Sequence, residues 1–138
     1  MTYLLDTNAC IALINGRPAG VRHRFQKVVE KGARVNVSAI VIFELWYGVA
    51  KSIQKEGNAN RLEIFLAGPI SILPFDEEDA EAAGRVRAEI EAAGKPIGVY
   101  DLLIAGQALR HKVTLVTANT NEFQRVPGLV FEDWAKSN

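Results

Sequence analysis

Apolar residues in this chain fall into two patterns, separated by turn-forming residues. Short apolar runs predict strands, and apolar positions repeated every three or four residues predict amphipathic helices. The predicted strands are Tyr3–Leu5, Arg34–Val37, Ile70–Phe75, Val113–Thr117 and, as an edge strand, Leu129–Glu132. Short strands alternating with helices predict an α/β fold, namely a three-layer α/β/α sandwich with a mostly parallel central sheet.

Capping residues and helical spacing place helices between these strands. Ser38 is a suitable N-cap, and Asp76 with Asp79 three residues later resembles a capping pair. The polar stretch 55–60 contains glycine and two asparagines, so it predicts a turn. The first predicted helix follows Thr7 or Asn8 and stops at Asn15. Further helices are predicted at 21–31, at 39–54, through 62–66 as a short helix, at 76–93, and from Val99 onwards.

Three carboxylates interrupt apolar runs of the chain. Asp6, Glu44 and Asp101 each stand among core-type residues. Burying a carboxylate is costly unless it is paired, hydrogen-bonded or bound to a metal. A further polar cluster near the end of the chain contains Asn119 and Glu122. Together these side chains predict a metal site built from oxygen ligands only.

The predicted topology explains how these residues could meet. Ligands bind beyond the carboxyl ends of the strands in open α/β sheets. Asp6 follows the first strand, and the cluster of Asn119 and Glu122 follows the fourth. Asp101 begins the helix that leads into that fourth strand, so it starts near the same rim. Glu44 joins them only if its helix passes over the rim. Mg²⁺ and Mn²⁺ prefer such oxygen ligands, and a site of this kind activates water for attack on a phosphodiester.

Each acid also has a purely structural interpretation. Asp6 is suited to capping the helix that follows it, and Asp101 to complementing a helix dipole from the first turn. Glu44 fits an outward position on an amphipathic helix. The acidic run 76–81 is interpreted as a solvated helix start, and His111 as a surface group.

Composition narrows the class of protein further. The 138 residues predict one domain covering 1–138, and 49% hydrophobic with 23% charged residues is typical of globular proteins. Sixteen basic and sixteen acidic residues give zero net charge, so a polyanionic substrate would need local cations. Cys10 is the single cysteine, and no apolar run has transmembrane length. We therefore expect a cytoplasmic protein without a membrane partner.

Five segments, in order along nearly the whole chain, carry a family resemblance. They are Leu4–Asn8, Ser38–Gly48, Ile70–Asp76, Ile97–Ala105 and Leu115–Phe123. Together they resemble the PIN-domain ribonucleases, and specifically the VapC toxins of bacterial type II toxin–antitoxin systems. One such segment would be a weak signal, whereas five in family order are a strong one.

The resemblance implies an endoribonuclease that uses Mg²⁺, or Mn²⁺ as a substitute, to hydrolyse RNA phosphodiester bonds with a metal-activated water. It implies that Asp6, Glu44 and Asp101 are metal-site acids. It places the fourth catalytic position at Asn119, with Glu122 as a supplementary ligand. Asn119 is neutral where many relatives carry an acid, so a second metal ion would be held less firmly.

The resemblance also implies a protein partner. A cognate antitoxin is expected to block the active site and to bury apolar surface on the helices at 39–54 and 59–66, with Trp46 or Tyr47 as an anchor. A homodimer of this chain within the toxin–antitoxin complex is expected as well.

Two other classes of function stay open at this point. One is a non-catalytic binding module on the same fold. The other is an aspartyl-phosphate phosphoacceptor or phosphatase with Asp6 as nucleophile. That chemistry needs a second acid beside the nucleophile or two residues later, and a lysine after a late strand. Thr7 and Asn8 follow Asp6 instead, and the strand 113–117 ends without lysine. Which RNA would be cleaved is not set by these patterns.

Overall fold

The computed structural model describes residues 1–136, which form one five-stranded sheet with helices around it. The strand order is β3-β2-β1-β4-β5, and each neighbouring pair is parallel. The strands are β1 (Thr2–Leu5), β2 (Arg34–Ser38), β3 (Ser71–Leu73), β4 (Thr114–Val116) and β5 (Phe131–Glu132). The predicted α/β fold with a mostly parallel central sheet is therefore confirmed.

The helices connect these strands in the predicted order, except for a short last helix that was not predicted. They are α1 (Thr7–Asn15), α2 (Ala19–Glu30), α3 (Ala39–Lys51), α4 (Lys55–Leu66), α5 (Glu77–Ala92), α6 (Val99–His111) and α7 (Thr120–Phe123). Within residues 1–136, none of them is long and apolar enough to cross a membrane.

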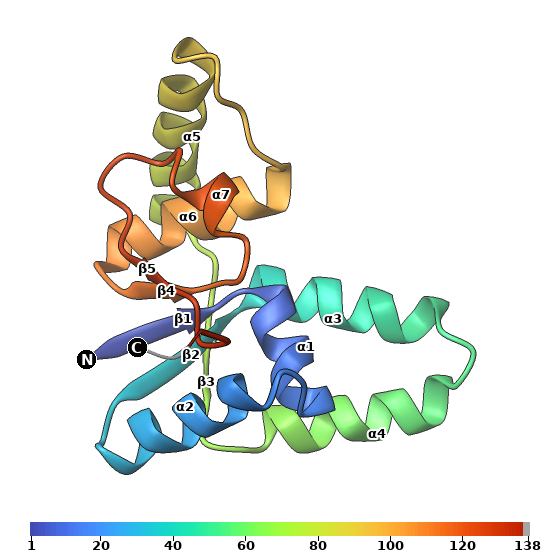
Figure 1. Cartoon of the computed structure of the whole chain (residues 1–138). Coiled ribbons are helices and arrows are strands. Elements are labelled where there is room, and N and C mark those ends of the chain that lie inside the picture. Colours follow the sequence, from blue (N-terminus) through green and yellow to red (C-terminus); the bar gives the residue numbers. More distant parts are fainter. Residues whose placement is uncertain (137–138) are drawn as a thin grey trace.

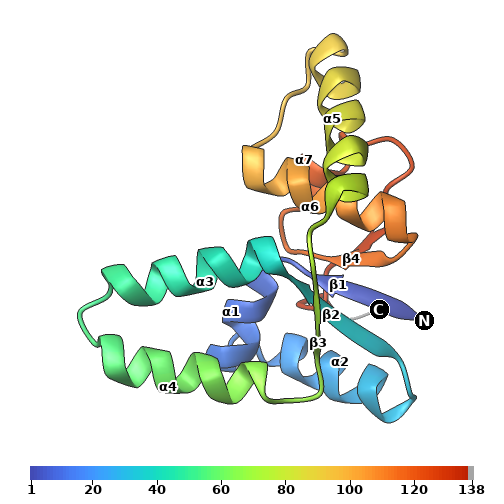
Figure 2. The same cartoon turned by 180° about the vertical axis from the view of Figure 1, so that it is seen from behind.

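Helices cover both sides of the sheet. Figures 1 and 2 show α5, α6 and α7 on one side and α1 and α2 on the other, whereas α3 and α4 extend beyond the carboxyl ends of the strands. Asp6 alone separates β1 from α1, and β2 runs directly into α3. The beginnings of α1 and α3 are consequently fixed at the same rim of the sheet.

The central strands form the middle of the core. Leu4 and Leu5 of β1 are fully buried, and Leu5 is in register with Val37 on one side and Val116 on the other. Strands buried on both faces have continuous apolar runs, which is why the alternation typical of a one-sided sheet is missing from the sequence. Burial of each such side chain contributes about 1.5–3 kcal/mol. The ends of β1 and β4 are therefore held rigidly.

The predicted turn at 55–60 is wrong, because α4 begins at Lys55 and continues to Leu66. Glycine and asparagine have low intrinsic helix propensity, but tertiary packing overrides it here. Leu62 is buried in the core, and the helix extends from it toward Lys55. Asn58 Nδ2 also donates a 3.0 Å hydrogen bond to Ser52 Oγ, which fixes the connection from α3. This connection ends α3 at Lys51, three residues before the predicted Gln54.

The two longest neighbouring helices, α5 and α6, pack without a gap. A Cβ atom added to Gly106 would lie 2.5 Å from Ala83 Cα, closer than atoms can approach. Glycine is thus required where α6 crosses α5. Asp76 and Asp79 form the predicted capping box at the start of α5, which is confirmed.

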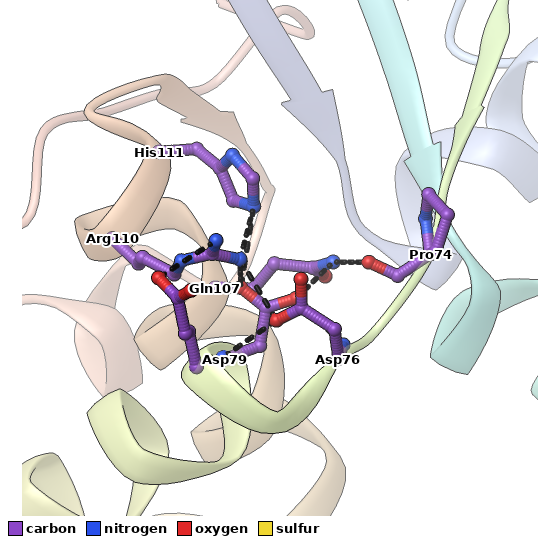
Figure 3. A network of polar contacts seen from close by, with 7 residues as sticks. Pro74, Asp76, Asp79, Gln107, Arg110 and His111 are labelled. Carbon is purple, nitrogen blue, oxygen red and sulfur yellow. Dashed lines mark hydrogen bonds and ion pairs between the residues drawn. The ribbon is translucent and has the colours of Figure 1, made fainter.

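Asp79 also joins a polar network between α5 and α6 that the sequence did not predict (Figure 3). It is fully buried, so the interpretation of 76–81 as a wholly solvated helix start is wrong at this residue. Arg110 Nη1 donates to Asp79 Oδ1 at 2.9 Å, and His111 Nε2 lies 3.2 Å from the same oxygen. His111 is therefore not a free surface group. Gln107 Nε2 donates to the carbonyl of Pro74 at 3.0 Å, which attaches α6 to the end of β3.

Candidate active site

Asp6 lies at the carboxyl end of β1 and caps α1. Its Oδ1 accepts a 2.8 Å hydrogen bond from the backbone N–H of Ala9. Burial raises the pKa of Asp6 above its ordinary value, interactions with the Thr117 side chain and the Ala9 N–H lower it, and the charges of Glu44 and Asp133 raise it. Asp6 is therefore the helix cap that the sequence suggested, and it also lies where the charges of Glu44 and Asp133 act on it.

Glu44 lies in the second turn of α3 and is half-buried. Its Oε1 accepts a 2.7 Å hydrogen bond from Thr7 Oγ1, the first residue of α1. The negative charge of Glu44 raises the pKa of both Asp6 and Asp101. The helix α3 thus passes over the rim, which was the condition for Glu44 to join the other acids.

Asp101 lies in the first turn of α6 and is half-buried. Burial, followed by the negative charges of Glu122 and Asp6, raises the pKa of Asp101 to about 6. The contact between the Asp101 and Glu122 side chains raises the pKa of Asp101 and lowers that of Glu122. Two carboxyl groups that shift each other's pKa in opposite directions are a sign of excess negative charge at this position.

Glu122 is held by the protein at both oxygens. The backbone N–H of Gly98 donates to Oε1 at 2.6 Å, and Asn119 Nδ2 donates to Oε2 at 2.6 Å. The bond from Gly98, followed by those from Asn119 and Asp101, lowers the pKa of Glu122 despite its partial burial. Asn119 is oriented in turn, because its backbone N–H donates to Thr117 Oγ1 at 2.9 Å. Asn119 therefore contacts the acids through Glu122.

Two residues at this rim were missed by sequence reasoning. Asp133 follows β5 directly, and its charge acts on Asp6. The rule that ligands gather beyond strand ends applies to β5 as well, so the signal was available. Thr7 was considered only as a helix cap, and its bond to Glu44 spans 37 residues of sequence.

The acids are coupled electrostatically but do not yet form a cage of metal ligands. Within residues 1–136, no three His, Cys, Asp or Glu side chains have an arrangement that could hold a metal ion. Glu44 is engaged by Thr7, and Glu122 by Gly98 and Asn119. The donor set nevertheless fits a hard divalent cation, because all its members are oxygens and their mutual repulsion would be relieved by positive charge.

Comparisons with known proteins agree with this geometry. The PIN domain family matches residues 3–129. The chain is 41% identical to ribonuclease VapC2 of Rickettsia felis over 136 residues, which cover 99% of this chain and all of the relative. It is 40% identical to the tRNA(fMet)-specific endonuclease VapC of Shigella flexneri over 135 residues, covering 98% of this chain and 99% of that protein.

Solved structures of toxin–antitoxin complexes resemble the same fold. The crystal structure of VapBC2 from Rickettsia felis, bound to a DNA fragment from the promoter, matches with a TM-score of 0.91 at 40% identity, covering 97% of this chain and 99% of that one. DNA-bound VapBC from Salmonella typhimurium matches with a TM-score of 0.89 at 38% identity, covering 97% of this chain and 98% of that one. The chain therefore belongs to the PIN domain family and, within it, to the VapC ribonucleases.

Proposed function

We propose that this chain is the toxin of a type II toxin–antitoxin module and hydrolyses RNA at the rim formed by β1, β4 and β5. The observation that carries the proposal is the raised pKa of Asp101, which burial and then the negative charges of Glu122, Asp6 and Glu44 bring to about 6. Perturbed carboxylates clustered at a strand rim are typical of functional sites rather than of structural ion pairs.

Asp6, Glu44, Asp101 and Asn119 are the proposed catalytic residues, with Glu122 as a supplementary ligand. A bound Mg²⁺ or Mn²⁺ would supply the Lewis acidity that activates water and neutralises charge at the phosphate. Asp6 and Asp101 would hold it, because their carboxylates carry the unrelieved repulsion. Asn119 keeps Glu122 in place beside Asp101.

The substrate is proposed from the chemistry of the rim and from one relative. The VapC of Shigella flexneri is named as a tRNA(fMet)-specific endonuclease, and the identity of 40% extends over nearly both chains. Initiator tRNA is therefore the first RNA to test. Attack by water at phosphorus does not use the substrate 2′-hydroxyl, so the products should have 5′-phosphate and 3′-hydroxyl ends.

We also propose that the cognate antitoxin occupies a groove between α1, α3 and α4. This groove has a volume of about 310 Å³ and reaches the acid Glu44. Its lining is Ile11, Ile14, Asn15, Glu44, Leu45, Gly48, Val49, Asn58, Arg61 and Leu62. Trp46 and Tyr47 are exposed on α3 outside this lining, and one of them stays the proposed anchor, while Val49 in the groove would add apolar contact.

The remaining expectations stay proposals. Residues 1–136 are proposed to act as a single nuclease domain, and the last two residues of the predicted range 1–138 lie outside those that the structure describes. Two copies of the chain are proposed to associate within the complex with the antitoxin. The cytoplasm is the proposed compartment, where Cys10 would stay reduced.

The test is cleavage of initiator tRNA by the purified chain after removal of the antitoxin. Activity should be absent in EDTA and return with Mg²⁺ or Mn²⁺, and ligation-based mapping should find 5′-phosphate ends. Asp101→Asn should be inactive, whereas Glu89→Gln, an exposed acid on α5, should match the unmodified protein. Cleavage that persists in excess chelator, or products with 2′,3′-cyclic phosphate, would contradict the proposal.

A further inference from the structure

Two exposed aromatic residues directly precede two of the site acids in the sequence. Phe43 precedes Glu44 on α3, and Tyr100 precedes Asp101 on α6. Their ring centroids are 5.8 Å apart and their planes are inclined by 51°. This distance is within the range of favourable aromatic contacts. The two rings therefore form one apolar surface built by two helices, which we call the aromatic pair.

The aromatic pair does not belong to the core. Phe43 is 55% exposed and Tyr100 is 46% exposed, whereas Val41 and Leu45 on the same helix α3 are buried. Figures 1 and 2 show the first turn of α6 above the first half of α3, at the side where the strands end. A single exposed aromatic residue needs no explanation, but two in contact beside a reactive site indicate a binding surface.

We propose that Phe43 and Tyr100 form a stacking platform for an unpaired base of the RNA next to the bond that is cleaved. This inference rests on the proposed ribonuclease function and deepens it. Proteins that read RNA bind mainly its unpaired regions, where bases are splayed out and stacked on aromatic side chains. Because each ring is on the residue before a site acid, a phosphate at the acids would have its neighbouring base within reach of the platform.

The charge of the protein favours this assignment. Net charge is zero, and the rim itself is acidic, so long-range electrostatic attraction to RNA is absent. Binding must then depend more on contacts without charge, and base stacking is the strongest of these. The groove proposed for the antitoxin has neither Phe43 nor Tyr100 in its lining, so the aromatic pair is a separate surface.

The experiment measures binding and does not depend on cleavage. The probe is a fluorescently labelled single-stranded oligoribonucleotide of about ten nucleotides, matched to a loop of initiator tRNA, with EDTA present. Phe43→Ala and Tyr100→Ala should each weaken binding about tenfold. Phe43→Trp and Tyr100→Phe should bind like the unmodified protein. Ile64→Ala, at a 73% exposed position of α4, is the control and should change nothing.

A second set of probes locates the stacked base. Each oligonucleotide in this set has one abasic nucleotide. At one position the abasic probe should bind the unmodified protein about tenfold more weakly. The same probe should bind Phe43→Ala no more weakly than the intact oligonucleotide does, because the contact is already lost.

Several results would overturn the platform. The first is that the alanine variants bind the oligonucleotide as tightly as the unmodified protein. The second is that an alanine variant loses further affinity when the probe is abasic. The third is that the unmodified protein binds no oligonucleotide. If the alanine variants turn a dimer into a monomer in sedimentation while RNA affinity per chain is unchanged, the pair is a contact between two copies instead. If the stacking results hold but no RNA is ever cleaved, the platform stands and the ribonuclease proposal fails.

Discussion

Thr7 Oγ1 donates a 2.7 Å hydrogen bond to Glu44 Oε1, which connects the first turn of α1 to the second turn of α3. The negative charge of Glu44, whose carboxylate this bond holds, raises the pKa of Asp6. A catalytic carboxylate depends on such partners, because its orientation is set by the hydrogen bonds around it.

The first prediction is that Thr7→Val lowers kcat/KM by about tenfold, because Glu44 loses its fixed orientation. Valine keeps the shape and branching of threonine, so α1 should still begin at residue 7. The free energy of unfolding should fall by about 1 kcal/mol, the usual net worth of one hydrogen bond. Thr7→Ser keeps the hydroxyl and should retain activity. If valine and serine behave alike, Glu44 is not positioned by this bond.

The second prediction concerns stability without metal. The pKa of Asp101 is raised to about 6 in the folded state, against about 3.9 when unfolded. The folded protein thus binds the extra proton, and stability falls as pH rises from about 4 to 6. Asp101→Asn should match the unmodified protein at pH 4 and be more stable at pH 8, by about 1 kcal/mol once partial exposure is allowed for. Urea unfolding in EDTA measures this, and equal stabilities at pH 8 would contradict the raised pKa.

The third prediction concerns pH and metal binding. Metal ligands must lose their protons, so Mn²⁺ competes with the proton on Asp101. With a pKa of about 6, apparent affinity should be about tenfold weaker at pH 5 than at pH 8. Titration of the melting temperature with Mn²⁺ gives both affinities. Glu89→Gln should show the same pH dependence, whereas an unchanged affinity between pH 5 and pH 8 would remove Asp101 from the ligand set.

The fourth prediction ranks the site residues by growth inhibition in cells. Asp6→Asn should abolish toxicity, because it removes one charge from a small set of oxygen ligands. Asn119→Ala should be milder, since Glu122 keeps its 2.6 Å bond from the backbone of Gly98. Asn60→Ala, at an exposed position on α4, should stay fully toxic. A toxic Asp6→Asn beside an inactive Asn119→Ala would reverse the proposed roles.

The convergence of the acids could be predicted because it depends on topology rather than on detailed packing. Asp6 and Asn119 follow strands whose carboxyl ends must share one rim when the sheet is parallel. Asp133 follows β5 by the same rule, and it directly follows the predicted edge strand Leu129–Glu132, so the same reasoning could have included it. The position of Glu44 depends on the direction of α3, which follows from packing against α1 and α4 and not from local sequence.

The errors have a common physical cause. The turn expected at 55–60 and the solvated interpretation of Asp79 both relied on local polarity. In the structure, Leu62 anchors the helix α4 despite its weak first turn, and Arg110 lies 31 residues from Asp79 in sequence. Contacts of that range leave no periodic pattern, so hydrophobic spacing cannot show them.

The last prediction tests whether Arg110 sustains the buried charge of Asp79. Arg110 Nη1 donates to Asp79 Oδ1 at 2.9 Å, and Asp79 is fully buried. Removal of one partner from a buried ion pair leaves a charge without compensation, which is far more costly than loss of a surface pair. Arg110→Ala should therefore lower the melting temperature by roughly 10 °C. Arg85→Ala breaks an exposed pair with Glu81 on α5 and should shift it by about 1–2 °C at most. The same variant has a second expected effect. Since the network attaches α5 to α6, Arg110→Ala should also speed proteolysis within 77–92. The Mn²⁺ affinity of the folded protein should stay unchanged. Equal melting temperatures for the two variants would show that Asp79 is neutralised by other groups, of which His111 at 3.2 Å is the nearest candidate.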